Sequence, residues 1–360
     1  MIIDSHSHIF PFLDGPCGFP TREDHMRVMQ LYMVGHSQPV RRLKDHVVVR
    51  EPTLSLEPPL GPESLFDVNF RVTRNGRFEW TKDGVDYYIH FMPPSLQCNA
   101  SPAEFILTQM AYVGVDVSVL QNAHLYGRLN DYLGEAVKRY PDKLIALACV
   151  DELKADTEDE MAELKRAVRI LGLKGLYYAN RGFFPVRYRW SFDDPRYEPF
   201  WELVRELRIP VFWELFAVPD MNDLSAYRRE MRRLLRWCER YPDVPCVLTH
   251  GIGVSHLSGP SFPELEALFG REQVSIELLY PIGWGRDHEY PYPELQPAIR
   301  TLYQRVGASR LVWGSDMPNV ERNCTYRQSL DYLRKHCDFI PSADMELILG
   351  GNLARMFGLH

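Results

Sequence analysis

Cysteine is sparse in this chain, and long apolar runs are absent. Seven cysteines lie singly among 360 residues, with no CxxC pair and an odd total, so a disulfide framework is not expected and a reducing compartment fits better. No apolar run approaches the ~18 residues of a membrane span. The N-terminus lacks the basic segment and long apolar stretch of a secretory signal. We therefore expect a cytoplasmic protein with no membrane partner.

The chain also has no excess of positive charge, because its 48 acidic residues outnumber its 41 lysines and arginines. The formal net charge is −7, which gives no electrostatic basis for binding nucleic acid. The one basic run, at 228–237, carries apolar residues at helical spacing and is interpreted as the solvated face of an amphipathic helix. A nucleotide-binding oxidoreductase would need GxGxxG after an early strand, whereas GIGVSH (251–256) lacks the third glycine. No GxSxG elbow or P-loop is present.

Short apolar runs alternate with amphipathic stretches from about residue 103 onward. Runs separated by helices are typical of βαβ units in a parallel sheet. With MIIDSHSH at the start, eight strands are predicted, at 1–8, 116–121, 144–150, 173–179, 209–215, 244–250, 274–279 and 310–316. Helices are predicted at 125–140, 155–171, 195–207 and 222–241. The pattern favours an α/β fold of the distorted TIM (β/α)8 barrel type, with a doubly wound open sheet as the alternative.

Residues 11–100 interrupt this alternation. They are rich in proline, and 66–91 reads as three strands joined at Asn75-Gly76 and Asp83-Gly84, which favour two-residue hairpin turns. We expect a β-rich insertion after the first strand that contains a three-stranded antiparallel meander and covers the mouth of the barrel as a lid. The barrel domain would then comprise 1–10 and 101–360.

Residue types that bind metals recur where the predicted strands end. Catalytic groups of such barrels lie at the carboxyl ends of the strands, and here those ends carry His6, His8, Glu214, His250, Glu277 and Asp316. His6 and His8 are two apart, so both would project from one face of their strand. Two imidazoles and a carboxylate can hold a divalent cation with a position left open, and such a cation activates water. Asp316 would touch the metal or accept a proton, while His250 would polarise the substrate.

Each of these residues also has a purely structural interpretation. HxH arises by chance, and a histidine after a strand often bonds to backbone in the core. Asp316 suits a helix cap or turn, and Glu214 could pair with an arginine. The hypothesis of a site depends on the predicted barrel, which brings all of them to one rim.

The motifs together resemble the amidohydrolase superfamily. DSHSH, LTHGIG, WGSDMP and the closing GGNLARMFGL occur in the family's order and spacing. AYVGVDVSVLQ and LNDYLGEAVKRYPDKLIALACVD are similar to the second and third strand regions of the amidohydrolase-related branch. That branch includes aminocarboxymuconate-semialdehyde decarboxylase, resorcylate-type decarboxylases, hydrolases and hydratases.

The resemblance implies a single metal, most often zinc, in a distorted TIM barrel. His6 and His8 would be ligands, Asp316 a ligand or proton acceptor, and His250 the catalytic histidine. The family usually places a histidine ligand at the end of the fifth strand, where this chain has Glu214. A glutamate ligand there would leave manganese or iron as alternatives to zinc. Glu214 could instead be an acid/base group, or the metal could be bound weakly or not at all.

We therefore expect a metal-dependent hydrolase acting on an amide, ester or lactone of a small organic acid. Non-oxidative decarboxylation or hydration at the same site is the alternative, and a non-catalytic binding barrel is a third. A carboxylate-bearing substrate needs a cationic clamp, for which Arg181, Arg286 and Arg322 follow strands. Tyr178, Trp213, Phe216 and Trp284 are candidate pocket walls. Relatives are commonly dimers, so a homodimer is expected by analogy.

Overall fold

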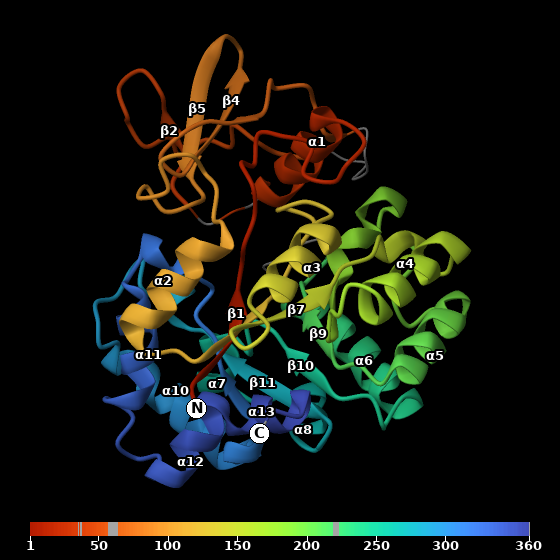
Figure 1. Ribbon diagram of the computed structural model, residues 1–360. Coiled ribbons are helices and arrows are strands. Elements are labelled where there is room, and N and C mark those ends of the chain that lie inside the picture. Colours follow the sequence, from red (N-terminus) through yellow and green to blue (C-terminus); the bar gives the residue numbers. More distant parts are fainter. Residues whose placement is uncertain (35, 37, 57–63, 219–222, 360) are drawn as a thin grey trace.

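The centre of the molecule is a barrel of eight parallel strands surrounded by helices (Figure 1). The computed structural model describes residues 1–34, 36, 38–56, 64–218 and 223–359. Neighbouring strands of the barrel are consecutive along the chain, in the order β1 (Ile3–Ser7), β6 (Val117–Leu120), β7 (Leu144–Ala148), β8 (Gly175–Ala179), β9 (Val211–Glu214), β10 (Cys246–Leu248), β11 (Val274–Leu278) and β12 (Leu311–Trp313).

The eight predicted strands are confirmed, and so is the distorted TIM barrel. The strands are almost wholly buried on both faces, which is why most of them read as apolar runs rather than as alternating patterns. The buried strand β1 is the exception, because four of its five residues are polar. The two ends of the sheet meet just beyond β12, where the His8 N–H donates to the Met317 carbonyl at 2.7 Å and the Asp316 N–H donates to the His6 carbonyl at 2.8 Å. These bonds bring the end of the chain's last strand against its first, so the sheet is not an open one.

The helices that follow the strands lie outside the barrel. They are α2 (Ala103–Val113), α3 (Asn130–Arg139), α4 (Glu158–Arg169), α5 (Glu198–Leu207), α6 (Leu224–Arg240), α7 (Val254–Ser258), α8 (Pro263–Phe269), α9 (Pro281–Trp284), α10 (Gln296–Val306), α11 (Tyr326–Arg334), α12 (Ser342–Glu346) and α13 (Asn352–Phe357). In the described part of the chain, no helix is both long and apolar enough to cross a bilayer.

The arginine-rich helix α6 corresponds to the helix predicted at 222–241, of which residue 222 lies outside the described residues. Its apolar face is buried. Its arginines pair with acids on neighbouring elements: Arg228 with Glu264 at 2.8 Å and Arg236 with Asp193 at 2.5 Å. The basic run therefore attaches α6 to the elements packed beside it, the helix α8 and the turn at Asp193.

The segment 11–100 forms a separate layer at one end of the barrel (Figure 1). It contains α1 (Arg22–Met33) and an antiparallel sheet in the order β2 (Arg41–Arg42), β5 (Val85–His90), β4 (Arg77–Lys82), β3 (Arg71–Val72). Residues 35, 37 and 57–63 of the expected insertion lie outside the described residues. The sheet has one strand, β2, that the sequence pattern did not predict, and β3 is only two residues long.

The two turns of the expected meander differ from each other. Asp83 and Gly84, with φ of 51° and 74°, form the two-residue turn between β4 and β5. The turn at Asn75-Gly76 is longer than predicted, because the Thr73 N–H donates to the Arg77 carbonyl and leaves residues 74–76 as a three-residue loop.

Candidate active site

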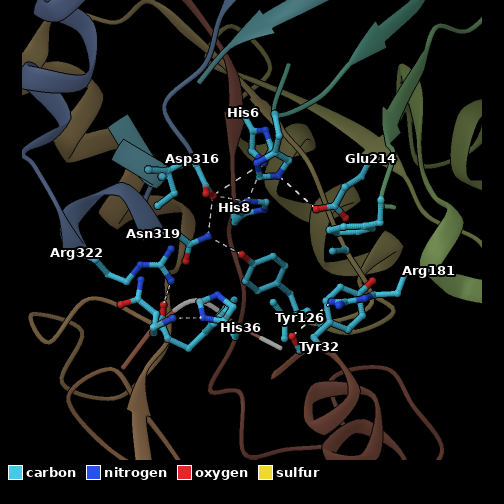
Figure 2. A pocket seen from close by; sticks show the side chains of 18 of the residues that line it. His6, His8, Tyr32, His36, Tyr126, Arg181, Glu214, Asp316, Asn319 and Arg322 are labelled. Carbon is cyan, nitrogen blue, oxygen red and sulfur yellow. Dashed lines mark hydrogen bonds and ion pairs between the residues drawn. The ribbon is translucent and has the colours of Figure 1, made fainter. Parts of the chain in front are cut away.

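The carboxyl ends of β1, β10 and β12 carry the histidines and the aspartate that the sequence singled out. His6 lies within β1 and His8 directly after it, while His250 and Asp316 follow β10 and β12. His250 and Asp316 adopt left-handed backbone conformations, with φ of 58° and 63°. Such conformations are uncommon outside glycine and cluster at functional sites. Both side chains line the cavity at the barrel mouth, where Figure 2 shows Asp316 beside His8.

His6, His8 and Asp316 form a compact cluster of metal-ligand atoms. One ligand atom from each lies within 4.8 Å of the others, and all three side chains are buried. His8 Nε2 lies 3.1 Å from His6 Nε2 and 3.0 Å from Asp316 Oδ1, and His6 Nε2 is 4.0 Å from the same oxygen. Glu214 is not a member of this cluster.

The hydrogen bonds of the other ring nitrogens fix the tautomers of both histidines. His6 Nδ1 donates to Glu277 Oε2 at 3.0 Å, and His8 Nδ1 donates to the Gln121 carbonyl at 2.9 Å. Both protons are therefore on Nδ1, and both Nε2 atoms present lone pairs. This is the arrangement that fixes ligand histidines in metal sites.

The donor set fits a divalent cation. Two lone pairs only 3.1 Å apart repel each other unless a positive charge lies between them. Two metal–nitrogen bonds of about 2.1 Å at an angle near 90–109° would separate the nitrogens by about 3.0–3.4 Å, which matches that spacing. Burial lowers the pKa of His8, which leaves its ring neutral and able to ligate. Burial disfavours the ionised form of Asp316, but its contact with His8 and the proximity of His6 and His250 outweigh burial and hold the pKa of Asp316 below its usual range.

Glu277 is hydrogen-bonded to His6 of the cluster. It is fully buried on β11, where it accepts hydrogen bonds from Ser5 Oγ at 2.5 Å, from His6 Nδ1 and from the His250 N–H at 2.8 Å. Burial opposes its ionisation, but the pairing of Glu277 with His6 outweighs burial and lowers the pKa of Glu277. The sequence placed Glu277 at the rim without giving it a role. Its role depends on the side-chain register across the barrel, which no local pattern encodes.

Glu214 lies beside His250. Its Oε1 is 3.3 Å from His250 Nε2, and Tyr177 Oη donates to its Oε2. Burial disfavours the imidazolium, but the hydrogen bond and charge of Glu214 more than compensate and raise the pKa of His250 to about 9. In turn His250 and Tyr177 lower the pKa of Glu214 against the effect of burial. The pair is therefore a carboxylate and an imidazolium near neutral pH.

A cavity of about 240 Å³ opens over these groups. Its floor is the histidine–aspartate cluster with His250 and Glu214, and its far side carries Arg181, Arg322, Tyr32 and His36 (Figure 2). The walls are completed by Gln38, Phe91, Ala123, Leu125, Tyr126, Tyr177, Phe216, Ile282, Gly283 and Asn319. Four lining residues, Tyr32, His36, Gln38 and Phe91, come from the segment 11–100.

Two of the three arginines predicted to bind substrate line the cavity. The Arg181 guanidinium lies 4.8 Å from the ring centres of both Tyr32 and Phe216. Arg322 donates to the Phe91 carbonyl, while its buried Nε has no hydrogen-bond partner among the described residues. Arg286 does not line the cavity and forms an ion pair with Asp287 at 2.7 Å.

The aromatic walls differ from those the sequence suggested. Phe216 lines the cavity, but Tyr178 and Trp213 pack in the core, with ring centres 4.9 Å and 5.3 Å from that of Trp201. Tyr177, one residue away, faces the cavity instead, because successive side chains of a strand point to opposite faces. Trp284 stacks on His288 and is not among the lining residues.

Comparisons with known proteins agree with this architecture. The family model described as amidohydrolase matches residues 3–359. No curated protein matches the chain at a significant level. Among solved structures, a probable 2-pyrone-4,6-dicarboxylic acid hydrolase from Acinetobacter baumannii with citric acid bound has 16% identity and a TM-score of 0.59, with 99% of each chain covered.

Two decarboxylases are also similar in fold. The 2,6-dihydroxybenzoate decarboxylase from Rhizobium has 19% identity, a TM-score of 0.54, and covers 71% of this chain and 88% of its own. A dihydroxybenzoic acid decarboxylase from a Polaromonas species, solved with manganese and 2-nitroresorcinol, has 19% identity, a TM-score of 0.52 and coverage of 71% and 85%. With a family match that spans nearly its whole length, this chain belongs to the amidohydrolase superfamily.

Proposed function

We propose that this protein is a metal-dependent hydrolase that cleaves an ester, lactone or amide of a small carboxylic acid. One observation carries the proposal: buried ligand atoms of His6, His8 and Asp316 converge beside a carboxylate–imidazolium pair, in a cavity that two arginines line. A divalent cation in this cluster, zinc by preference with manganese or iron as alternatives, would supply Lewis-acid polarisation and water activation.

The protein's own groups account for the proton transfers. Asp316 is an ionised carboxylate at the cluster, so it accepts the proton that water releases as its oxygen bonds to the carbonyl carbon. His250 is held protonated by Glu214 and donates to the leaving oxygen or nitrogen as its bond to that carbon breaks. Glu214 thus acts through His250 in this proposal, in place of the ligand role that the family pattern suggested.

Arg181 and Arg322 bind the carboxylates of the substrate. Both guanidinium groups lie on the far side of the cavity from the ligand cluster (Figure 2). Burial lowers the pKa of Arg322, which means that an anion brought next to it would be favoured. A dicarboxylate is the class of acid that this arrangement suits best.

The segment 11–100 is proposed to be the lid of this site. It contributes Tyr32, His36, Gln38 and Phe91 to the cavity wall, while the ligand and acid–base groups come from the barrel. Residues 1–10 and 101–360 would then be the catalytic domain. The boundaries of this division follow from the sequence pattern.

Decarboxylation of an aromatic or unsaturated acid is the second candidate. The fold is shared with solved dihydroxybenzoate decarboxylases, and an imidazolium such as His250 could return a proton to carbon after carbon dioxide leaves. Hydrolysis is preferred because the hydrolase structure is similar over 99% of both chains, including the segment 11–100, whereas the decarboxylases cover 71% of this chain. That preference is an analogy of fold.

Isotope incorporation distinguishes the two reactions. Protein loaded with zinc, manganese or iron is incubated with lactones, esters and hydroxybenzoates bearing one or two carboxylates, in water enriched in ¹⁸O and, separately, in deuterium oxide. Hydrolysis places one ¹⁸O in the acid product and releases no carbon dioxide. Release of carbon dioxide, with deuterium on the carbon that had carried the carboxylate, would establish the decarboxylase instead. Metal-dependent ligand binding with no conversion of any compound would favour a binding barrel.

A further inference from the structure

We infer that Tyr126 is a further catalytic residue, which donates a hydrogen bond to the substrate carbonyl oxygen as that oxygen becomes an anion. This inference rests on the proposed hydrolysis. Tyr126 lies in the loop after β6, is only 3% exposed and lines the cavity next to the ligand cluster (Figure 2). Its ring centre is 4.4 Å from that of His8, and it stacks on Phe10 at 4.9 Å with 13° between the planes. The phenol is therefore held in one position.

The hydrogen bonds of Asn319 determine which way the Tyr126 proton points. Asn319 Nδ2 lies 2.7 Å from Asp316 Oδ1 and 2.7 Å from Tyr126 Oη. The amide group facing Asp316 must be the NH₂, because an ionised carboxylate only accepts hydrogen bonds. Its two protons go to the carboxylate and the phenol, so Tyr126 Oη accepts from Asn319. The phenol's own proton is then left to donate elsewhere.

That proton has no acceptor among the described residues. Because one nitrogen bridges the two oxygens with bonds of 2.7 Å, Tyr126 Oη is at most twice that distance from Asp316 Oδ1. A carbonyl oxygen presented to the ligand cluster is therefore within reach of the phenol hydrogen.

Such a donor stabilises the tetrahedral adduct more than the planar substrate. Negative charge grows on the carbonyl oxygen as the water oxygen bonds to carbon, and a donor already oriented toward that oxygen needs no rearrangement. The proton stays on the phenol throughout, so Tyr126 exchanges no atoms with the substrate. Asn319 is the positioning residue, because it occupies the phenol oxygen and keeps the O–H from turning toward the Asp316 carboxylate.

The binding test uses two anions of similar length on the zinc-loaded protein. 3-Phosphonopropionate carries three phosphonate oxygens, as the tetrahedral adduct does, while succinate carries a planar carboxylate in its place. Calorimetry on Tyr126→Phe should show about 10–100-fold weaker binding of 3-phosphonopropionate, the loss typical of a hydrogen bond to a charged group. The succinate affinity should change much less. Equal losses for both ligands, or no loss for either, would overturn the inference.

A matched control separates this effect from general loss of structure. Tyr197→Phe removes the hydroxyl of another buried tyrosine, which donates to the Leu153 carbonyl at 3.0 Å and does not line the cavity. This variant should leave both affinities unchanged. Zinc content should equal that of the wild type in both variants, because neither tyrosine belongs to the cluster.

Kinetics supply the second readout. With a substrate found by the isotope experiment, Tyr126→Phe should lower kcat by about 100-fold with little change in KM. Asn319→Ala should also lower kcat, because the Tyr126 hydroxyl is then no longer oriented by the Asn319 amide. A Tyr126→Phe variant with normal kcat would overturn the inference while leaving the hydrolase proposal intact. If the wild type hydrolyses nothing, the proposed function fails, and the two affinities still decide whether Tyr126 recognises a tetrahedral anion.

Discussion

The two sides of the cavity are built in different ways. On the barrel side, the ring nitrogens of His6 and His8 that face away from the cluster are bonded to Glu277 and to the backbone of Gln121. On the insertion side, Tyr32 and Phe91 touch the cavity's arginines through ring faces and backbone carbonyls. The Arg181 guanidinium lies between two ring faces, which constrain its direction less than hydrogen bonds constrain the two imidazoles. From this difference we expect the barrel side to carry out the chemistry and the insertion side to recognise the substrate.

Removing a cluster residue should have the largest effect. His6→Ala and Asp316→Ala each take one donor from the cluster and leave the remaining charges buried and unmatched. We expect metal content and turnover to fall together, by more than the roughly 100-fold that loss of a ligand's supporting partner costs. Elemental analysis of the purified variants, beside rates at saturating metal, measures both. Asp142→Ala, at an exposed position, is the control. Full occupancy in both cluster variants would remove these residues from the metal site.

Replacing His250 should separate metal binding from turnover. His250 pairs with Glu214 outside the cluster, so His250→Asn should keep the metal and lower kcat by about 100–10,000-fold, the range for one acid–base group. The same rate and metal assays apply. Normal turnover in this variant would contradict the proton-donor role.

The two buried glutamates of the barrel side give a sharper contrast. Glu277 accepts a hydrogen bond from His6 Nδ1, whereas Glu214 accepts a hydrogen bond from Tyr177 and forms an ion pair with His250. Glu277→Gln should weaken metal affinity by about 10–100-fold. Glu214→Gln should leave that affinity unchanged and lower kcat. Metal titration against a competing chelator measures both variants, and weakened binding in Glu214→Gln alone would return Glu214 to the ligand role that the family pattern implied.

Much of the barrel could be predicted from sequence because its strands are buried on both faces. LIALA and VFWE read as apolar runs wherever they occur. Once the barrel is assigned from such runs, the ends of β1, β10 and β12 bring His6, His250 and Asp316 to one rim. The supporting contacts could not be predicted in the same way. Which side chain meets His6 Nδ1 depends on the register between β1 and β11, which lies two strands away at the closure of the barrel, and that register is set by packing of the whole sheet.

The loops and the insertion were less predictable for another reason. Tyr126 lies in a turn and Asn319 begins a four-residue 3-10 helix, and such short segments have no periodic pattern that would predict which side chain faces inward. Tyr177 and Tyr178 are neighbours on β8, but Tyr177 lines the cavity and Tyr178 is buried in the core. A prediction that assigns the two faces of the strand the wrong way round therefore selects the wrong tyrosine. The segment 11–100 displays hairpin turns in its sequence, but nothing in that pattern indicated which of its residues would reach the arginines.

The smallest expected effect lies on the insertion side. Arg181 is held between Tyr32 of α1 and Phe216 after β9, with 4.8 Å to each ring centre. Tyr32→Leu and Phe216→Leu each remove one ring face, which is worth about 1 kcal/mol for a cation over an aromatic ring. If Arg181 only anchors the substrate carboxylate, each variant should raise KM about 3–10-fold and leave kcat within about twofold, since ground and transition states lose the contact equally. Steady-state kinetics of the two variants side by side test this. A fall in kcat with Tyr32→Leu alone would give the insertion a part in the chemistry, and the division between the two sides of the cavity would no longer hold.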